Sequence, residues 1–409
     1  MASSSTPIKS IIALVILNFL FLSHASYAPP PSYAQPPSYA AAAELPKLCN
    51  FDDLYKPGGE HIFDDIENCN VGLFKMCKIN EIYQFGDSIS DVGNLIREMP
   101  AVGAATPLAR LPYGGDFPMG PTGRASNGNL MIDYFAMDAG LPLLPPFKKY
   151  DADFSHGVNF AVVGSTALPW DALAALNISS PVTNTSQSVQ LDSLSAYFYS
   201  IHKDSSGKLE NSLFMLGSFG GSDYHYALFQ EKTIHEIETT LVPKVVDAIM
   251  AAVGRLISLG ARKVVVPGLY TIFRLPIYRT AFPGNNDMFE VSDDLAIYHN
   301  ALLQRAIDKF NQEESPDAMV IYGDCFTAYE RLETYAVGRM NLMVCCGSGG
   351  GSYNLDLTRM CGADGVSACA EPNKHISWDG ENLTQEAYRI MTKYLLHHIF
   401  VGFQCPYPY

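Results

Sequence analysis

Four short apolar runs rich in β-forming residues constrain the fold of this 409-residue chain more than any other feature. They read EIYQF before Gly86, LFMLGSF at 213–219, RKVVVPGL at 262–269 and AMVIYGD at 318–324. Apolar runs of this length, bounded by glycine or aspartate, are typical of strands buried on both faces of a parallel sheet. The chain is therefore predicted to contain such a sheet at its centre.

Helical patterns lie between and after these runs, at 234–259, 293–314 and 384–400. The last of them begins at Thr384, a residue suited to an N-cap, and its apolar residues repeat at helical spacing: Ala387, Ile390, Met391, Tyr394 and Leu395. Hydrophobic residues make up 48% of the chain and charged residues 17%, enough apolar material for a sizeable core. Alternation of strands and helices predicts a three-layer α/β/α sandwich with a central parallel sheet, flavodoxin-like, over residues 81–409.

The first strand leads directly into a serine. Gly86-Asp87-Ser88 follows EIYQF and precedes DVGNLIRE, which is predicted to form a helix. Ligands of open α/β sheets bind outside the carboxyl ends of the strands, where Ser88 would lie. Free N–H groups at a helix N-terminus stabilise a developing oxyanion. A three-residue motif is weak by itself, because Gly-Asp-Ser also forms ordinary turns.

Six blocks in a fixed order strengthen this interpretation. They read FGDSISDVGN at 85–94, GVNFAVVGSTAL at 157–168, GSFGGSDY at 217–224, VVVPGL at 264–269, CCGSGGGSYN at 345–354 and SWDGENLTQEAYR at 377–389. Together they resemble the plant GDSL esterase/lipase family, a branch of the SGNH hydrolases, over about residues 77–403. The stretch CKINEIYQFGDSISDVGNLIRE is most similar to the acetylajmalan esterase-like group, which acts on plant alkaloid esters.

The resemblance implies roles for three residues that match the family pattern. Ser88 matches the nucleophile, and Asp379 matches the aspartate of the catalytic triad. Gly164 matches the glycine whose backbone N–H contributes to the oxyanion hole. An SGNH-hydrolase-like fold and hydrolysis of a small ester are the corresponding expectations.

Two further positions depart from that pattern. Ser222, in GGSD, stands where the family has an oxyanion-hole asparagine, and Asn382, in DGEN, stands where it has the triad histidine. Loss of one oxyanion donor costs about a hundredfold or more in turnover. Loss of the base costs more, because serine is a poor nucleophile without a proton acceptor and an amide nitrogen accepts no proton.

Two other histidines are candidates for the missing base. His375 lies four residues before Asp379, and His225 lies three residues after Ser222. Each also has an ordinary interpretation as a surface or loop histidine. Asn382 is formally a glycosylation sequon as well, in Asn-Leu-Thr, and burial would protect it from modification.

Two smaller departures suggest a remodelled pocket. Asn127 stands where the family commonly has aspartate, and Leu269 follows the Pro-Gly pair where asparagine is common. Sequence drift is the alternative explanation for both.

The N-terminus is predicted to be an export signal followed by a spacer. Residues 1–25 contain a positive residue, a twelve-residue apolar run and a small-residue cleavage site, and the run is too short to span a bilayer. Residues 26–43 are rich in proline and predict an extended linker. Residues 44–80 form a cysteine-containing segment that is expected to pack on the main domain. Secretory-pathway residence, extracellular or vacuolar, follows from the signal.

Nine cysteines in an exported chain predict disulfides, and the odd count leaves at least one thiol unpaired within the chain. The pairing is open at this point. Zinc is disfavoured because no CxxC pair or matching histidine spacing occurs, and no motif implies a metal or an organic cofactor. Asn177 and Asn184 lie in glycosylation sequons in a polar segment.

The formal net charge of −15 indicates which partners to expect. An acidic surface repels phosphate, which argues against nucleic-acid binding and against stable insertion into an anionic membrane. A small-molecule ester or alkaloid-type compound is the expected partner. The function implied is an ester hydrolase of plant specialised metabolism, acting on an alkaloid or iridoid ester with an atypical triad.

Two alternatives stay open because the base is replaced. In the first, the inherited pocket guides cyclisation, proton transfer or acyl transfer without hydrolysis. In the second, the protein binds a small molecule and is catalytically inactive.

Overall fold

The computed structural model describes residues 72–98, 103, 105–201, 209–271, 274–283, 286–313 and 317–405, with side chains in the helix at 286–313 described from Leu295 onward. The predicted signal peptide, the linker and residues 44–71 of the cysteine-containing segment lie outside these residues. Within the part of the chain that is described, no helix is long and apolar enough to cross a membrane.

A five-stranded, fully parallel sheet forms the centre of the molecule, as the apolar runs predict. Its strands stand in the order β2-β1-β3-β4-β5. Their bounds are Glu81–Phe85 (β1), Gly157–Asn159 (β2), Ser212–Leu216 (β3), Lys263–Pro267 (β4) and Met319–Gly323 (β5). Every residue of β3 is buried, because helices cover both faces of the sheet.

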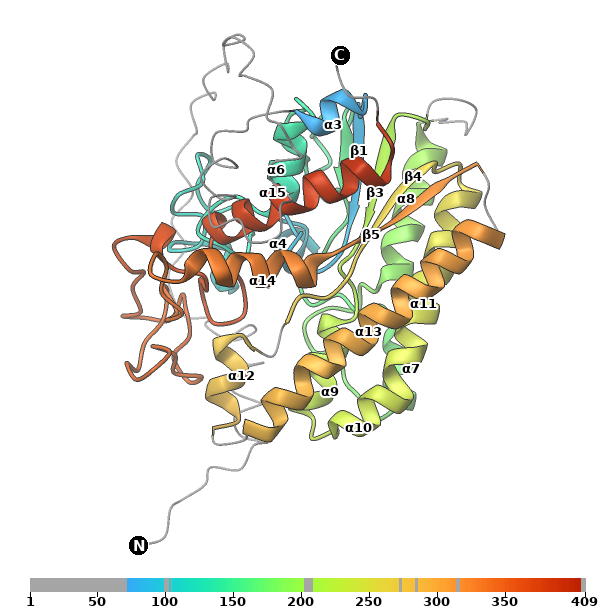
Figure 1. Ribbon diagram of the computed structural model, residues 1–409. Coiled ribbons are helices and arrows are strands. Elements are labelled where there is room, and N and C mark those ends of the chain that lie inside the picture. The colour runs from blue at the N-terminus through green and yellow to red at the C-terminus, as the bar shows by residue number, and fades with distance from the viewer. Residues whose placement is uncertain are drawn as a thin grey trace, which may run out of the picture.

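Two layers of helices enclose the sheet, and the three-layer prediction is confirmed (Figure 1). One face carries α6 (Met131–Asp138), α14 (Cys325–Ala336) and α15 (Gln385–Gly402). The other carries α8 (Gln187–Ser200), α11 (Val242–Ser258) and α13 (Asn286–Glu313). The shorter helices are α3 (Leu73–Met76), α4 (Leu95–Glu98), η2 (Pro107–Ala109), α7 (Trp170–Ala175), α9 (Gly221–Phe229), α10 (Ile234–Glu236), α12 (Pro276–Ala281) and η5 (Pro372–Lys374).

The strand register brings the carboxyl ends of the central strands to one edge. Phe85 of β1 pairs with Leu216 of β3, and Pro267 of β4 pairs with Gly323 of β5. Gly217 donates its backbone N–H to the Phe85 carbonyl, so the chain leaves β1 and β3 side by side. This edge is where the sequence predicts ligands to bind.

The helix at 234–259 is predicted as one element, but the structure divides it. A π-helical turn, Ile237–Leu241, separates α10 from α11. Pro243 follows this turn, and because proline has no N–H to donate, a regular α-helical ladder cannot run through it. The predicted N-cap of α15 is confirmed, since Thr384 Oγ1 accepts from the Ala387 N–H at 3.3 Å.

The helix predicted over residues 91–98 forms only in its second half. A single helical turn, closed by the Asp91 N–H on the Asp87 carbonyl, follows the strand, and α4 begins only at Leu95. The Asp91 carboxylate holds this segment instead, accepting backbone N–H groups from Gly93, Asn94 and Leu95. The prediction of a helix over DVGNLIRE is therefore wrong for its first four residues.

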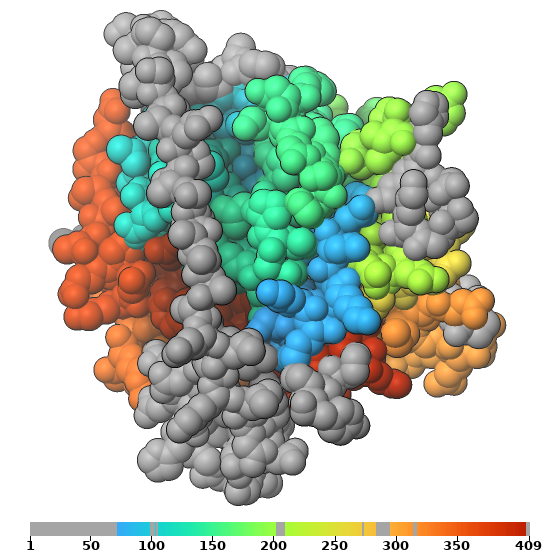
Figure 2. All heavy atoms as spheres, turned by 90° about the horizontal axis from the view of Figure 1, so that it is seen from above, coloured from blue at the N-terminus to red at the C-terminus, as the bar shows by residue number. Residues whose placement is uncertain are grey.

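The two ends of the described chain lie together at the amino edge of the sheet, opposite the edge that carries Ser88. Cys77, after α3, forms a disulfide with Cys405, after α15. Figure 2 looks onto this edge and shows the blue first residues beside the red last ones. Phe74 of α3 is buried and stacks on Phe135 of α6, with ring centroids 5.4 Å apart.

Two more disulfides, Cys345–Cys369 and Cys346–Cys361, lie in the region between α14 and α15. Cys325 is unpaired and buried, which agrees with the odd cysteine count. Cys49 and Cys69 lie outside the described residues.

Candidate active site

Ser88 lies at the carboxyl edge of the sheet, three residues after the end of β1, and its side chain is half-buried. The turn that carries it is fixed on both sides. Gly86 exchanges two hydrogen bonds with the Gln190 side chain, and Asp91 receives the Val163 N–H at 2.9 Å. The serine is thus placed on a rigid turn beside the loop that contains Gly164.

Gly164 adopts φ +78°, a conformation that favours glycine. A Cβ at this position would lie 2.6 Å from Tyr226 Oη and 2.7 Å from Val182 Cβ. Tyr226, on α9, donates its hydroxyl to the Gly164 carbonyl at 2.9 Å. The loop therefore approaches α9 so closely that only glycine fits.

Helix α9 also carries Ser222, which is half-buried in its first turn. A Cβ built on Gly221 would stand 3.8 Å from Asp87 Oδ2, so the start of α9 faces the turn of Ser88. Asp223 accepts the N–H groups of Ala167 and Leu168, which follow Gly164. The turn that carries Ser88 and the loop that carries Gly164 thus both contact α9, the helix that carries Ser222.

Asp379 is buried and accepts four hydrogen bonds. Its Oδ1 accepts the backbone N–H groups of Glu381 and Asn382, at 3.0 and 2.7 Å. Its Oδ2 accepts the Tyr113 hydroxyl at 2.9 Å and the Asn382 side-chain amide at 3.0 Å. Burial raises the pKa of Asp379, and the hydrogen bonds act in the opposite direction.

Asn382, which stands at the position expected for a triad histidine, donates its side-chain amide to Asp379 Oδ2. Because a carboxylate only accepts, the amide nitrogen must face Asp379, and this fixes Oδ1 as the other atom. Asn382 is 3% exposed, and Oδ1 has no hydrogen-bond partner among the described residues. This position offers an acceptor and no basic nitrogen.

His225, one of the two candidate bases, lies in α9 and faces the Asp379 loop. Its Nδ1 is 2.8 Å from the Tyr278 hydroxyl and 3.8 Å from Glu381 Oε1. Its ring stacks on Phe229 with centroids 4.5 Å apart. Burial lowers the pKa of His225 to about 4, so the imidazole is neutral at physiological pH.

His375, the other candidate, serves to hold the backbone. Its Nδ1 donates to the Met343 carbonyl at 2.8 Å, and its own carbonyl accepts the Thr384 hydroxyl. In the described structure no contact links the His375 ring to Asp379 or Asn382. His225 is therefore the better placed of the two.

Glu381 belongs to this site although sequence reasoning did not select it. Its side chain is 27% exposed. Burial, and then the charges of Asp379 and Asp87, raise the pKa of Glu381 to about 8. The carboxyl is thus largely protonated at neutral pH. Its position between Asp379 and Asn382 is the feature of the sequence that could have identified Glu381 as a site residue.

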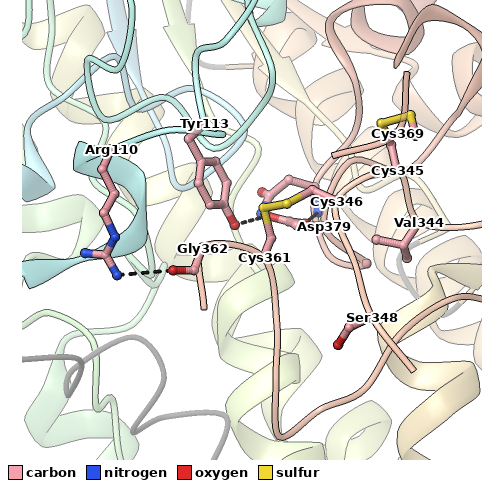
Figure 3. Close-up of a disulfide and its surroundings, with 12 residues drawn as sticks. Arg110, Tyr113, Val344, Cys345, Cys346, Ser348, Cys361, Gly362, Cys369 and Asp379 are labelled. Carbon is pink, nitrogen blue, oxygen red and sulfur yellow. Dashed lines mark hydrogen bonds between the residues drawn. A yellow bond between two sulfur atoms is a disulfide. The ribbon is translucent and has the colours of Figure 1, made fainter. Parts of the chain in front are cut away.

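Tyr113 was also missed, and no local pattern could have identified it. It lies 266 residues from the carboxylate that it contacts. Figure 3 shows its hydroxyl directed at Asp379, beside the Cys346–Cys361 disulfide. Cys346 donates its N–H to the Trp378 carbonyl at 2.6 Å, so this disulfide is hydrogen-bonded to the loop that carries Asp379.

Two departures from the family pattern have structural partners. Asn127 Oδ1 accepts the Gln385 N–H at 2.8 Å and its amide nitrogen donates to Asp116, so Asn127 joins the start of α15 to an early loop. Leu269 is buried, and its side chain faces the Gly221 position, where an added Cβ would be 3.8 Å away.

The three sequons differ in accessibility. Asn177 and Asn184 are exposed, whereas Asn382 is buried. An oligosaccharide on Asn382 would have to displace its contact with Asp379.

Comparison with known proteins places this arrangement in a family. A model described as GDSL-like Lipase/Acylhydrolase matches residues 82–395. Acetylajmalan esterase 2 of Rauvolfia serpentina is 41% identical over 342 residues, which cover 81% of this chain and 93% of that protein. Acetylajmalan esterase of the same plant is 40% identical over 346 residues, 81% of this chain and 88% of that protein.

A GDSL esterase/lipase of Arabidopsis thaliana is 38% identical over 352 residues, which cover 80% of this chain and 87% of that protein. The matches span the strands, α9 and most of α15, and they confirm the resemblance drawn from the six sequence blocks. The chain belongs to the GDSL esterase/lipase family of hydrolases.

Proposed function

We propose that this protein hydrolyses a small ester of plant specialised metabolism, such as an acetylated alkaloid, with Ser88 as the nucleophile. One observation carries the proposal, namely the convergence of three chain segments on α9. The helix contacts the Ser88 turn near Gly221, the Gly164 loop through Tyr226 and the Asp379 loop through His225. The acetylajmalan esterases among the relatives support an alkaloid ester as the substrate class.

In the proposed mechanism Ser88 Oγ attacks the ester carbonyl, and its proton passes to the neutral His225 imidazole, directly or through one water. The Gly164 N–H and the Ser222 hydroxyl donate to the oxyanion of the tetrahedral intermediate. The imidazolium returns the proton to the departing alcohol. Water, deprotonated by the same imidazole, then releases the acid from the acyl-serine.

His225 takes the role of base because Asn382 has no proton-accepting nitrogen. Glu381, 3.8 Å from His225 Nδ1, stabilises the imidazolium when its carboxyl is ionised. Asp379 no longer faces a histidine, and its role is to hold Asn382 and the backbone of Glu381.

We also propose that the protein resides in the secretory pathway and is finally extracellular or vacuolar. Three disulfides support an oxidising compartment, and exposed Asn177 and Asn184 are the proposed glycosylation sites.

The test is to express the mature chain and incubate it with acetylated alkaloids and iridoid esters, with products followed by mass spectrometry. A fluorophosphonate probe should label Ser88 covalently. Ser88→Ala is the control and should lose both labelling and product. Turnover of the esters that persists in Ser88→Ala would refute the mechanism.

A second function is favoured by the unpaired Asn382 Oδ1, which suits recognition better than proton transfer. In that case the pocket binds its small molecule without hydrolysis. The same experiment separates the two, because a binding protein would retain the unmodified ester and leave the fluorophosphonate unreacted.

A further inference from the structure

The Asn382 amide oxygen is a buried acceptor that receives no hydrogen bond from the described part of the chain. The side chain is 3% exposed, and its nitrogen is already used on Asp379. A buried carbonyl oxygen without a donor is destabilising, so a donor brought by a ligand would be stabilised here.

The surroundings of this oxygen are acidic. Asp87, Asp379 and Glu381 lie close enough that the first two raise the pKa of the third. Among the described residues, His225 lies 3.8 Å from Glu381, and the charge of Glu381 acts on five buried phenols: Tyr113, Tyr226, Tyr270, Tyr278 and Tyr388.

No positive charge from the described residues acts on this acidic cluster. Among the described residues, no lysine or arginine contributes to the pKa of Glu381 or of Asp379. His225 does not supply the charge either, because its buried ring is neutral. Buried carboxylates are stabilised by a cation, and a neutral donor would leave their repulsion in place.

We propose that Asn382, with Asp87, Asp379 and Glu381, recognises a protonated amine of the substrate, whose N–H donates to Asn382 Oδ1. We call these four residues the amine pocket. The inference deepens the proposed function, since it names the charge of the ester that Ser88 would attack. It explains the amide at position 382 as a recognition group in place of a base.

An ammonium group fits this pocket better than a metal ion does. Both oxygens of Asp379 already accept two hydrogen bonds each, so they have little coordinating capacity left. An amine needs one acceptor for its N–H and only the charge of the nearby carboxylates. Calcium chloride is therefore a useful competitor in the test, with no effect expected.

The experiment measures binding to the Ser88→Ala chain by calorimetry at pH 8, so that no ester is consumed. Three acetates serve as probes: 4-acetoxy-1-methylpiperidine, which is protonated, its neutral isostere 4-methylcyclohexyl acetate, and 4-acetoxy-1,1-dimethylpiperidinium, which has charge but no N–H. The protonated probe should bind at least about tenfold more tightly than the isostere and more tightly than the quaternary probe.

Two variants in the Ser88→Ala background locate the effect. Asn382→Leu removes the acceptor at similar volume, and Glu381→Gln removes a charge without changing shape. Each should reduce the preference for the protonated probe to below about threefold. Asp364→Asn, at an exposed carboxylate, removes the same charge elsewhere and should leave the preference intact.

Equal affinities for the protonated probe and the isostere would overturn the inference, and would indicate that water alone satisfies Oδ1. So would a preference that persists in Glu381→Gln, which keeps the inference testable even if Asn382→Leu does not fold. Equal binding of the quaternary probe would overturn the role of Oδ1. If the amine binds selectively but the wild-type chain hydrolyses none of the acetates, the proposed function fails and the inference stands.

Discussion

Asn382 donates its side-chain amide to Asp379 but cannot accept a proton, and its replacement by histidine provides a direct test. In Asn382→His the new Nδ1–H can donate to Asp379, as the amide does now, and Nε2 is free to accept the serine proton. Hydrolysis of p-nitrophenyl acetate should rise by about ten- to a hundredfold, measured spectrophotometrically.

The control for this gain is Ser88→Ala combined with Asn382→His, in which it should disappear. An unchanged rate in Asn382→His alone would mean that His225 already supplies all the base that the reaction can use.

The ionisation of Glu381 leads to a prediction of how the rate of hydrolysis depends on pH. Its pKa is raised to about 8, so the carboxyl is neutral below that pH and ionised above it. Ionised Glu381 stabilises the His225 imidazolium, so kcat/KM for a neutral ester should increase from pH 7 to 9 with a midpoint near 8. Glu381→Gln should abolish this inflection. If the inflection survives, it belongs to another group, and Asp87, with a pKa raised to about 7, is the next candidate.

Sequence patterns could propose Ser88, Gly164, Ser222 and Asp379 as site residues because these residues lie in short blocks with recognisable spacing. They could not identify Tyr113 or choose between His225 and His375. Those assignments depend on which side chains meet after folding, such as His225 with Tyr278 or His375 with the Met343 carbonyl. No local pattern records a contact of that kind.

At the scale of elements, α9 is the part that holds the site together. Its close approach to the Gly164 loop makes a direct prediction. Gly164→Ala would place a Cβ 2.6 Å from Tyr226 Oη in a backbone conformation that alanine disfavours. We expect a loss of about 1–3 kcal/mol in the free energy of unfolding, with reduced esterase activity.

Gly254→Ala in α11 is the matched control for that loss. A Cβ there meets nothing within 4 Å, and it should stabilise the helix by about 0.5–1 kcal/mol. Thermal unfolding of both variants would measure the difference. Equal melting temperatures would show that the Gly164 loop can shift to accommodate the added methyl group at little cost in stability.

The strands were predicted more accurately than the segments between them, for physical reasons. Buried parallel strands are apolar throughout, so β1, β3, β4 and β5 could be found within a few residues. β2 has three residues and too short a pattern to detect. The predicted helix at 91–98 begins late because the Asp91 carboxylate accepts the backbone N–H groups of Gly93, Asn94 and Leu95.

At the scale of the whole molecule, the disulfides are expected to differ in whether they support the site or only the stability of the fold. Cys346–Cys361 closes a short loop behind Trp378 and Asp379, with a sequence separation of 15. Replacing both cysteines by alanine should cost about 3 kcal/mol of stability and also lower activity at temperatures where the chain remains folded. Calorimetry and initial rates measure the two effects.

Cys77–Cys405 provides the comparison. It spans 328 residues and lies at the amino edge of the sheet. Its double alanine variant should lose about 4–5 kcal/mol or more but retain kcat in the folded state. If the variant without Cys77–Cys405 lost kcat and the variant without Cys346–Cys361 did not, the roles assigned to the two disulfides would both be wrong.

The Cys77–Cys405 bridge has a practical consequence for handling the enzyme. Cys77 and Cys405 lie together at the amino edge of the sheet, and β1, which begins near Cys77, leads to Ser88 at the opposite edge. A resin or surface coupled at this amino edge would therefore leave the edge that carries Ser88 facing the solution. Immobilised preparations should consequently work on dissolved esters as fast as free ones.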